Sequence, residues 1–342
     1  SRAGIDVRLR HSVVALREAG RISVASSDGS YELAAKRIIL AMGARENSRA
    51  ARLAPGDRPI GVLNTGALQA YIYLQKLLPF RRPVIVGTEL VSLSAILTCL
   101  RAGVRPAGVI EANAEPTARW PLSLFPRLVG VGVHYSSAVV DIHGGARVEG
   151  VTIRRADGLS TNIECDGVLF TGCFTPEAAL ARMGHLAVDP GTGGPIIDDY
   201  GRCSDPAYFA AGNVLRPVET AGWSFREGRR VGLAVADDLA AVHETPQGEI
   251  LVRRGVGVKL IAPQRLSYGA RARGFDYLQL RVDREISGDL QVAANGSLLW
   301  RRRVHARREK RILIPLCDFH IPANTGMLDV GFAGLNLDRA RS

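Results

Sequence analysis

The sequence lacks any long hydrophobic run. Its apolar stretches, such as Val84-Ile85-Val86, are short, and none approaches the roughly 20 apolar residues that a helix needs to span a bilayer. The first residues, starting with Ser1 and Arg2, contain neither an initiator Met nor an apolar leader segment. We therefore expect a cytoplasmic protein with no membrane span.

Patterns typical of disulfides and metal sites are also missing. The cysteines form no CxxC pair; they are Cys99, Cys165, Cys173, Cys203 and Cys317. An odd number of scattered cysteines fits reduced thiols better than a disulfide framework. The seven histidines show no spacing typical of metal ligands. The sequence therefore predicts no disulfide framework and no metal site.

Positive charge is abundant, but it is not interleaved with aromatic residues. The net charge is +11, and residues 245–342 hold 17 Lys and Arg against 9 Asp and Glu, so most of the excess lies there. A basic surface can attract nucleic acid, anionic lipid or an acidic protein. Because aromatic residues that would stack on bases are not interleaved with Arg301-Arg302-Arg303 or Arg307-Arg308, we favour a solvated face or a protein partner over nucleic acid.

The chain contains enough apolar material for several domains. Its 342 residues are 46% hydrophobic, which predicts two or three domains with sizeable cores. Apolar strands that end in glycine, at 37–41 and 167–172, are typical of a parallel sheet covered on both faces. A strand at 83–86, a helix at 90–102 and a strand at 105–111 predict a right-handed βαβ unit of the Rossmann type. The fold class is therefore α/β.

Beyond residue 243 the pattern changes to short runs of alternating polarity. The candidate strands are 277–282, 289–293, 297–300, 311–316 and 327–332. Asn295-Gly296, between two of them, is a strong hairpin signal. These features predict a small antiparallel β domain, either a sandwich or an open barrel.

The turn after strand 83–86 carries a degraded dinucleotide fingerprint. Of the glycines in GxGxxG only Gly87 is present, while Glu89 replaces the second and Ser92 the third. Glu89 would direct a carboxylate towards a pyrophosphate, which is unfavourable. Glu111 ends the next strand, where a ribose-binding acid would sit and would favour NAD over NADP. Two interpretations remain open: a scaffold without a nucleotide, or a weak NAD(P) site at Gly87 and Glu111.

Two other stretches place a glycine at the end of an apolar strand. Ala41-Met42-Gly43-Ala44-Arg45 follows the strand at 37–41, and Gly212-Asn213 follows Tyr208-Phe209-Ala210-Ala211. Glycine lets the backbone approach a ligand closely. After Gly212 the residues Thr220-Ala221-Gly222 begin a helix that extends to 241, and a helix N-terminus suits an anionic or electron-rich ligand. Ordinary strand-to-helix turns would explain the same residues.

Taken together, these motifs resemble the pyridine nucleotide–disulfide oxidoreductase superfamily, whose flavoproteins contain two dinucleotide-binding domains. Ala41-Met42-Gly43 is similar to the family's Ala-Thr-Gly after a strand, and Ala210-Ala211-Gly212-Asn213 to its late Ala-x-Gly-Asp motif, with Asn213 in place of Asp. The resemblance implies FAD bound by Ala41, Gly43, Ala44, Arg45, Gly212, Asn213, Thr220, Ala221 and Gly222. It also implies NAD(P) as a second cofactor, at Gly87 and Glu111.

A narrower resemblance concerns residues 56–67 and 211–222. These segments look like the large subunits of heteromeric amine and amino-acid oxidoreductases: the sarcosine oxidase α chain, the hydrogen cyanide synthase B subunit, and the A or α subunits of opine and proline dehydrogenases. It implies a second flavoprotein subunit and a small iron–sulfur subunit as partners. The family's first GxGxxG and its redox CxxC are both absent, so we expect an N-terminally truncated flavin domain and no disulfide chemistry.

The predicted organisation has four segments. They are the second part of an FAD-binding domain (1–80), an inserted NAD(P)-binding-like domain (81–165), the final part of the FAD-binding domain (166–243) and the C-terminal β domain (244–342). The predicted activity is that of an FAD-dependent oxidoreductase, or its electron-transferring subunit, acting between a small amine or amino-acid substrate or NAD(P)H and a flavin. The alternative is a non-catalytic assembly or interaction subunit with a vestigial nucleotide site. No residue stands out as a catalytic base.

Overall fold

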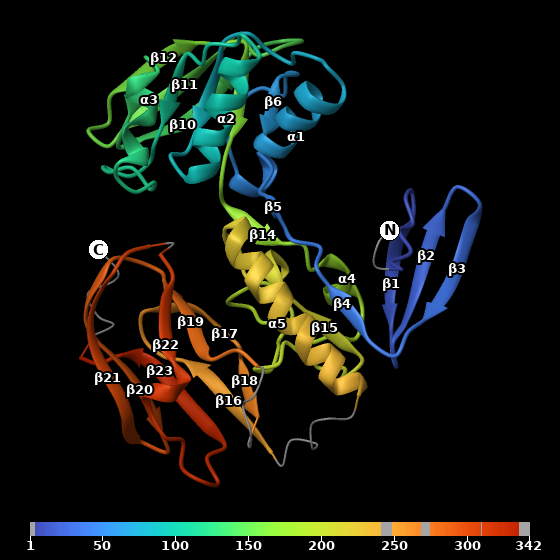
Figure 1. Ribbon diagram of the computed structural model, residues 1–342. Helices are drawn as coiled ribbons and strands as arrows, with labels where there is room; N and C mark the ends of the chain where they lie inside the picture. Colours follow the sequence, from blue (N-terminus) through green and yellow to red (C-terminus); the bar gives the residue numbers. More distant parts are fainter. Residues whose placement is uncertain (1–3, 241–247, 268–273, 309, 335–342) are drawn as a thin grey trace. The chain divides into compact units, whose positions relative to one another are not determined.

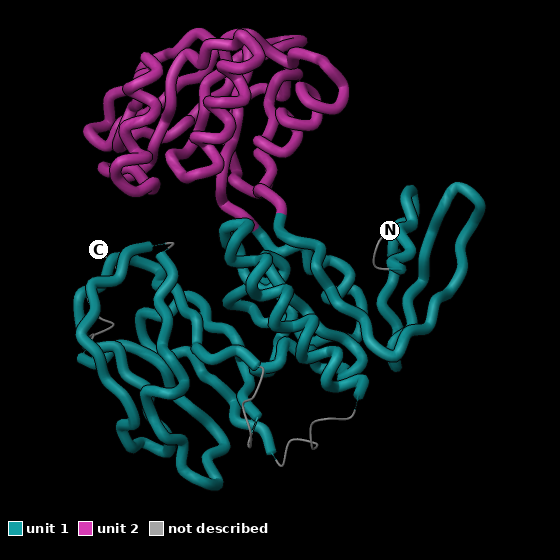
Figure 2. The backbone as a smooth tube through the Cα atoms, viewed as in Figure 1, with its two compact units in different colours: residues 1–44, 175–342 teal, residues 45–174 magenta. Residues whose placement is uncertain are grey.

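The computed structural model describes residues 4–240, 248–267, 274–308 and 310–334. The chain forms two compact units (Figure 2). Unit 1 comprises residues 1–44 and 175–342, and unit 2 comprises residues 45–174. The chain passes between them at the short strands β5 (Ala44–Glu46) and β14 (Phe174–Pro176), which pair with each other.

Unit 2 is built on a parallel sheet with the order β6-β13-β7-β8-β9. Its strands are β6 (Val62–Asn64), β7 (Pro83–Val86), β8 (Gly108–Ile110), β9 (Val133–His134) and β13 (Gly167–Phe170). Helix α2 (Leu90–Arg101), which is labelled in Figure 1, connects β7 to its parallel neighbour β8, and this confirms the predicted βαβ unit. Because β13 pairs with both β6 and β7, unit 2 is wider than the predicted segment 81–165.

The other elements of unit 2 are short or antiparallel. A second, antiparallel sheet consists of β10 (Ser137–His143), β11 (Gly150–Arg155) and β12 (Ser160–Glu164). The helical segments are η1 (Ala50–Arg52), η3 (Leu122–Leu124) and α3 (Phe125–Leu128). Helix α1 (Thr65–Gln69) is followed by a π-helical turn, η2 (Ala70–Leu74). The N-cap of α1 is Asn64, whose side-chain oxygen accepts the Ala67 N–H.

Unit 1 begins with a three-stranded antiparallel sheet of β1 (Ser12–Arg17), β2 (Arg21–Ser26) and β3 (Gly29–Ala34). Next comes β4 (Ile38–Leu40), whose parallel neighbour β15 (Tyr208–Ala210) is remote in sequence. The helices of this part are α4 (Ala179–Met183), η4 (Gly212–Val214) and α5 (Ala221–Leu239).

The C-terminal part of unit 1 is a two-sheet β domain. One sheet has the order β18-β16-β23-β20-β21 and the other β17-β19-β22. The strands are β16 (Glu249–Arg254), β17 (Val258–Ala262), β18 (Arg265–Ser267), β19 (Tyr277–Val282), β20 (Ile286–Ala294), β21 (Ser297–Ala306), β22 (Ile312–Pro315) and β23 (Met327–Phe332), with η5 (Leu316–Asp318) between the last two. Asn295 and Gly296 both have positive φ in the predicted hairpin turn.

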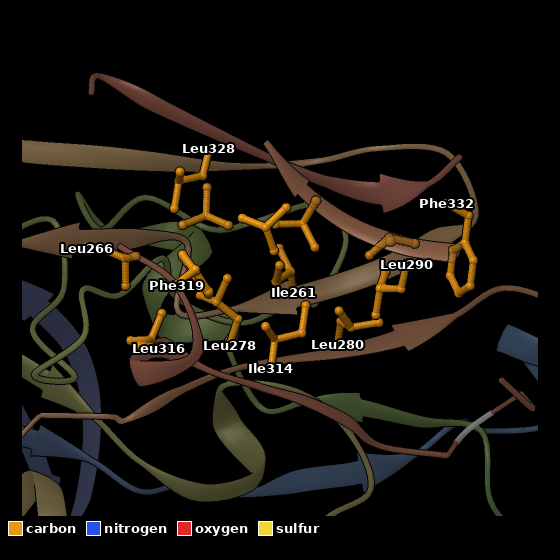
Figure 3. Close-up of a cluster of buried hydrophobic side chains, with 14 of the residues drawn as sticks. Ile261, Leu266, Leu278, Leu280, Leu290, Ile314, Leu316, Phe319, Leu328 and Phe332 are labelled. Carbon is orange, nitrogen blue, oxygen red and sulfur yellow. The ribbon is translucent and has the colours of Figure 1, made fainter. Parts of the chain in front are cut away.

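Side chains from both sheets fill one apolar core, as expected for a sandwich (Figure 3). Leu290 and Leu328 come from the first sheet, and Leu280 and Ile314 from the second; all four are fully buried. The predicted β domain is therefore confirmed, although β16 and β23 run parallel. No helix in the described part of the chain is long and apolar enough to cross a membrane.

Candidate functional site

In unit 1, two glycines follow the ends of adjacent parallel strands. Strands β4 and β15 are in register from Ile38 opposite Tyr208, and the Ala211 N–H donates to Leu40 O over 3.1 Å. Gly43 and Gly212 therefore lie at the same edge of this two-stranded sheet, with φ of +76° and +79°. A Cβ on Gly43 would meet only open space. The two glycine turns thus lie together, and glycine at both positions lets the backbone be approached closely.

Helix α5 begins next to Gly212. Ser224, in its first turn, is the residue that a Cβ on Gly212 would approach, at 3.6 Å. Thr220 is the N-cap, and Ala221 and Gly222 are exposed. The N–H groups of a first helical turn have no acceptor within the helix. The Ser224 Oγ is buried and has no hydrogen-bond partner in the described structure. This corner can therefore donate hydrogen bonds to an electron-rich group.

The remaining predicted flavin residues are placed less directly. Ala41 lies between β4 and β5, and Ala44 is the first residue of β5. Arg45 follows in β5 but belongs to unit 2. The Asn213 amide closes its own loop, because Oδ1 accepts the Glu219 N–H over 2.7 Å and Nδ2 donates to Glu219 O over 3.3 Å. One donor and one acceptor position of Asn213 remain for a ligand.

A buried network of charged and polar side chains fixes the position of Gly212. The Glu227 carboxylate accepts the Gly212 N–H over 2.7 Å and also binds Arg216. Arg216 donates to Gln279 Oε1 of the β domain over 2.7 Å. All three side chains are almost completely buried. The position of Gly212 is thus coupled through two side chains to strand β19.

The same strand holds the loop before α5. Arg281 donates to Glu219 Oε1 and to Pro217 O, over 2.7 and 2.6 Å, and also binds Val218 O. Val218 has φ +66°, a strained conformation for a β-branched residue. Gln279 and Arg311 donate to the Glu219 carboxylate as well. The β domain, whose role the sequence does not indicate, therefore fixes the loop that leads into the helix N-terminus.

The second candidate region is the crevice at the carboxyl end of the sheet in unit 2. Strand β7 has β8 on one side, reached through α2, and β13 on the other, so the point between β7 and β13 is a topological switch point. Gly87 and Gly172 follow these two strands with φ of +117° and +70°. A Cβ on either glycine would overlap the Glu89 carboxyl group. The Glu89 side chain therefore lies in the crevice, against both turns.

The environment of Glu89 favours its neutral form. Burial raises the pKa of Glu89 to about 7, and the nearby Glu111 carboxylate acts in the same direction. A hydrogen bond from its own backbone N–H, the Thr171 hydroxyl, 3.2 Å from Oε2, and the charge of Arg52 all oppose the rise. Near neutral pH the Glu89 carboxyl group is therefore only partly ionised.

The predicted ribose acid, Glu111, is 4% exposed and already hydrogen-bonded. Its Oε1 accepts the backbone N–H of Asn113 over 2.9 Å and the Asn113 side-chain amide over 2.6 Å. Its Oε2 accepts the Thr88 hydroxyl. The Thr88 Oγ1 accepts the Thr117 N–H in turn, over 2.9 Å. Glu111 thus stands at the predicted place after β8, and most of its acceptor capacity serves the local loop.

Thiols and metal ligands offer no second centre in the described residues. Burial raises the pKa of both Cys99 and Cys203 to about 12, which makes these thiols poor nucleophiles. Cys173 and Cys317 are exposed free cysteines. Within the described ranges, no three His, Cys, Asp or Glu side chains are grouped as metal ligands.

Comparisons with known proteins agree with this architecture. The family model for pyridine nucleotide-disulphide oxidoreductases matches residues 1–231. Among curated proteins, none matches the sequence significantly. The solved structures that are similar include the thioredoxin reductase of T. acidophilum, with a TM-score of 0.55 and 19% identity over 67% of this chain and 74% of that chain.

Two further solved structures resemble the chain at the same level of identity. An FAD-dependent pyridine nucleotide-disulphide oxidoreductase from Desulfovibrio vulgaris has a TM-score of 0.54 and 19% identity, over 82% of this chain and 72% of that one. A ferredoxin reductase from Rhodopseudomonas palustris has a TM-score of 0.53 and 19% identity, over 84% and 67%. At such identities the likeness shows the fold alone.

The network around Glu219 predicts a stability effect. Replacing Arg281 with Ala leaves buried carbonyls and part of the Glu219 carboxylate without a donor, and we expect the free energy of unfolding to fall by about 3–5 kcal/mol. Arg253→Ala, which removes an exposed ion pair with Asp329 in the same domain, is the control and should cost far less. Urea denaturation measures both losses. Equal losses would show that the buried network contributes nothing special.

Glu89 predicts a pH effect on stability. The folded chain keeps a proton on Glu89 up to about pH 7, whereas the ordinary pKa of a Glu side chain is 4.5. The contribution of this proton to the stability of the folded state is therefore fully present below the ordinary pKa of 4.5. It is lost as the pH rises through the folded-state pKa of about 7. We expect the difference in unfolding free energy between the wild type and Glu89→Gln to change across this window. Glu164→Gln, on an exposed position of β12, should give a flat difference, and a flat difference for Glu89→Gln would contradict the assignment.

Proposed function

This chain belongs to the pyridine nucleotide-disulphide oxidoreductase family of FAD-dependent oxidoreductases, for which FAD and NAD(P) are the typical cofactors, and from that premise we propose that unit 1 binds a flavin. The flavin would exchange electrons with a small amine or amino-acid substrate or with NAD(P)H. The observation that supports this most is the corner formed by Gly43, Gly212 and the N-terminus of α5 at one sheet edge.

The residues of this corner fit the ring and ribityl part of FAD. Gly43 faces open space, and Gly212 presents its backbone without a side chain. The Ser224 Oγ is a buried hydroxyl without a partner in the described structure, as expected where a ligand supplies one. The sequence contains no GxGxxG, so these residues account for the ring side of the cofactor and not for its ADP moiety.

The chain's own residues would hold and tune the bound group. A flavin supplies transfer of one or two electrons and of a hydride. The first-turn N–H groups at Thr220, Ala221 and Gly222 would stabilise the negative charge of its reduced form, because the N-terminus of a helix carries a partial positive charge. Glu227 keeps Gly212 in place, and Arg281 keeps the strained Val218 loop in place. The β domain therefore acts as a support for the flavin corner.

A second candidate function is suggested by the crevice of unit 2. The Glu89 carboxyl group lies where a dinucleotide would approach the Gly87 turn, so the residues present do not fit NAD(P). This observation favours an assembly or interaction subunit of a heteromeric flavoenzyme. The narrower resemblance to the large subunits of amine and amino-acid oxidoreductases points the same way. A second flavoprotein subunit and a small iron–sulfur subunit are the partners that we propose for it.

The flavin proposal is tested on the purified protein. We expect a visible flavin spectrum after purification or after reconstitution with FAD. Under anaerobic conditions, amines, amino acids and NADH are added one at a time, and loss of the flavin absorption identifies the electron donor. A protein that neither co-purifies with flavin nor takes it up would contradict the proposal. Recovery of a flavoprotein or iron–sulfur partner without any such bleaching would favour the interaction subunit.

Ser224 allows a sharper test of the same corner. Ser224→Ala removes one hydrogen bond to the ligand, so flavin affinity should fall by about three- to tenfold, as for a single neutral hydrogen bond. Stability without flavin should not change, because the hydroxyl has no protein partner in the described structure. Ser297→Ala, at an exposed position of β21, should change neither quantity. Unchanged flavin affinity in Ser224→Ala would remove Ser224 from the site.

A further inference from the structure

The crevice of unit 2 retains the framework of a nucleotide site. It lies at the switch point between β7 and β13, and the 12-residue helix α2 begins directly beside it. Gly87 makes the first turn with φ +117°, and Ser92, in place of the third glycine, is fully buried against the sheet. Glu111 stands at the end of β8. Glu89, which replaces the second glycine of the GxGxxG pattern, is the one substitution whose side chain lies in the crevice itself.

The Glu89 carboxyl group is held inside that crevice by contacts from three directions. Glu89 is the N-cap of α2, has an extended backbone, and its side chain makes no capping hydrogen bond to the helix. Its oxygens lie against the Gly87 and Gly172 turns, where a Cβ on either glycine would overlap them. Thr171 Oγ1, at the end of β13, lies within hydrogen-bond distance of Glu89 Oε2, at 3.2 Å, and also bonds Val86 O over 2.8 Å. A carboxyl group thus stands at the helix N-terminus, the position that favours an anion.

From these contacts we propose that Glu89 occupies the phosphate position of this crevice and excludes a dinucleotide from a site that is otherwise intact. Its volume fills the space beside the two glycines. When ionised, it also repels a pyrophosphate. This role of Glu89 concerns unit 2 alone and does not depend on flavin binding by unit 1. Glu89 by itself would close the crevice to a nucleotide, without any general decay of the fold.

The ligand that the opened crevice would take is NAD(H) and not NADP(H). Glu111 follows β8, where a carboxylate accepts hydrogen bonds from the ribose hydroxyls and repels a 2′-phosphate. Three of the roughly four acceptor positions of this carboxylate are used by Asn113 and Thr88, which leaves one for a ribose hydroxyl. The opened site should therefore discriminate between the two dinucleotides.

The test is a gain of binding in Glu89→Gly. Glycine is an acceptable N-cap and restores the missing glycine; Glu89→Ser, with a better cap and a small side chain, is the second variant in case the first unfolds. Isothermal titration calorimetry with NADH, NADPH and ADP-ribose is carried out on the whole chain without flavin, at a pH well above 7 so that Glu89 is ionised. We expect both variants to bind NADH at least about tenfold more tightly than the wild type does. We also expect them to bind NADH at least about tenfold more tightly than they bind NADPH.

Two control variants distinguish the effect of the Glu89 side-chain volume on NADH binding from the effect of its charge and from unspecific effects of removing a carboxylate. Glu89→Gln keeps the volume and removes the charge, and it should remain closed. Glu115→Gly removes an exposed carboxylate of the same unit and should also leave the wild-type affinity unchanged. Circular dichroism verifies that each variant is folded.

Three results would overturn the proposal. Wild-type binding as tight as that of Glu89→Gly would show that the crevice is open. Failure of both folded variants to bind would show that something other than Glu89 excludes the nucleotide. Tight binding by Glu89→Gln would show that charge alone excludes it and that the side chain does not occupy the position. Loss of flavin binding in a separate experiment would leave each of these results unaffected.

The charged groups around Glu89 predict how the closed state responds to acid. Glu111 raises its pKa, whereas Arg52 lowers it; Glu46, whose Oε1 accepts the Gly172 N–H over 3.2 Å, is the other carboxylate at these turns. Below about pH 7 Glu89 loses its charge but keeps its volume. The wild type should therefore remain closed at acidic pH, in the same way as Glu89→Gln, and binding that appears on acidification would likewise overturn the proposal.

Discussion

The cost of burying a carboxylate is the constraint on which the corner in unit 1 depends. Glu227 is 1% exposed, and a buried charge is stable only when it is paired and hydrogen-bonded. The Gly212 N–H and the Arg216 guanidinium supply those bonds, and Arg216 in turn requires Gln279. The strand end, helix α5 and strand β19 must therefore form together. The helix N-terminus is accurately placed because none of these groups can move without leaving another unpaired.

Both units place a glutamate beside glycines at the ends of parallel strands, with opposite consequences. In unit 1, Glu227 lies behind Gly212, accepts its N–H, and leaves the space around Gly43 open. In unit 2, Glu46 plays a comparable part by accepting the Gly172 N–H, but Glu89 lies on the ligand side of the same turn. A glutamate thus supports the Gly212 turn, and another glutamate covers the Gly172 turn. The two cases differ in the side of the turn on which the carboxyl group lies.

Local features of the chain were largely predictable from the sequence. The βαβ unit around Gly87, the hairpin at Asn295-Gly296 and the start of α5 at Ala221 all rest on short-range propensity and turn chemistry. The strands β4 and β15 were also predictable one by one, since both are apolar and each is followed by a glycine turn. The extent of unit 2 was not, because β13 joins β6 across about a hundred residues and no local pattern encodes that contact.

The ionic network was missed for a related reason. Gln279 and Arg281 alternate with Leu278, Leu280 and Val282, and in a single sequence that alternation is typical of a strand with one face in solvent. Their face is in fact covered by the loop before α5, so both side chains are buried. The one available signal was the pair of acidic residues Glu219 and Glu227, which lie close to the predicted helix start. If they are buried, they need basic or hydrogen-bonding partners elsewhere in the chain.

The position of strand β21 at a sheet edge suggests a role for some of the excess positive charge of the C-terminal domain that does not involve ligand binding. It is the last strand of its sheet, ten residues long, and one of its backbone edges has no neighbour in the described sheet. An open edge of that length is a template for pairing with other chains. Arg301, Arg302 and Arg303 are exposed in its middle, where two copies would bring like charges together. The arginines thus act as protection against edge-to-edge aggregation, and this part of the positive charge contributes to keeping the domain soluble.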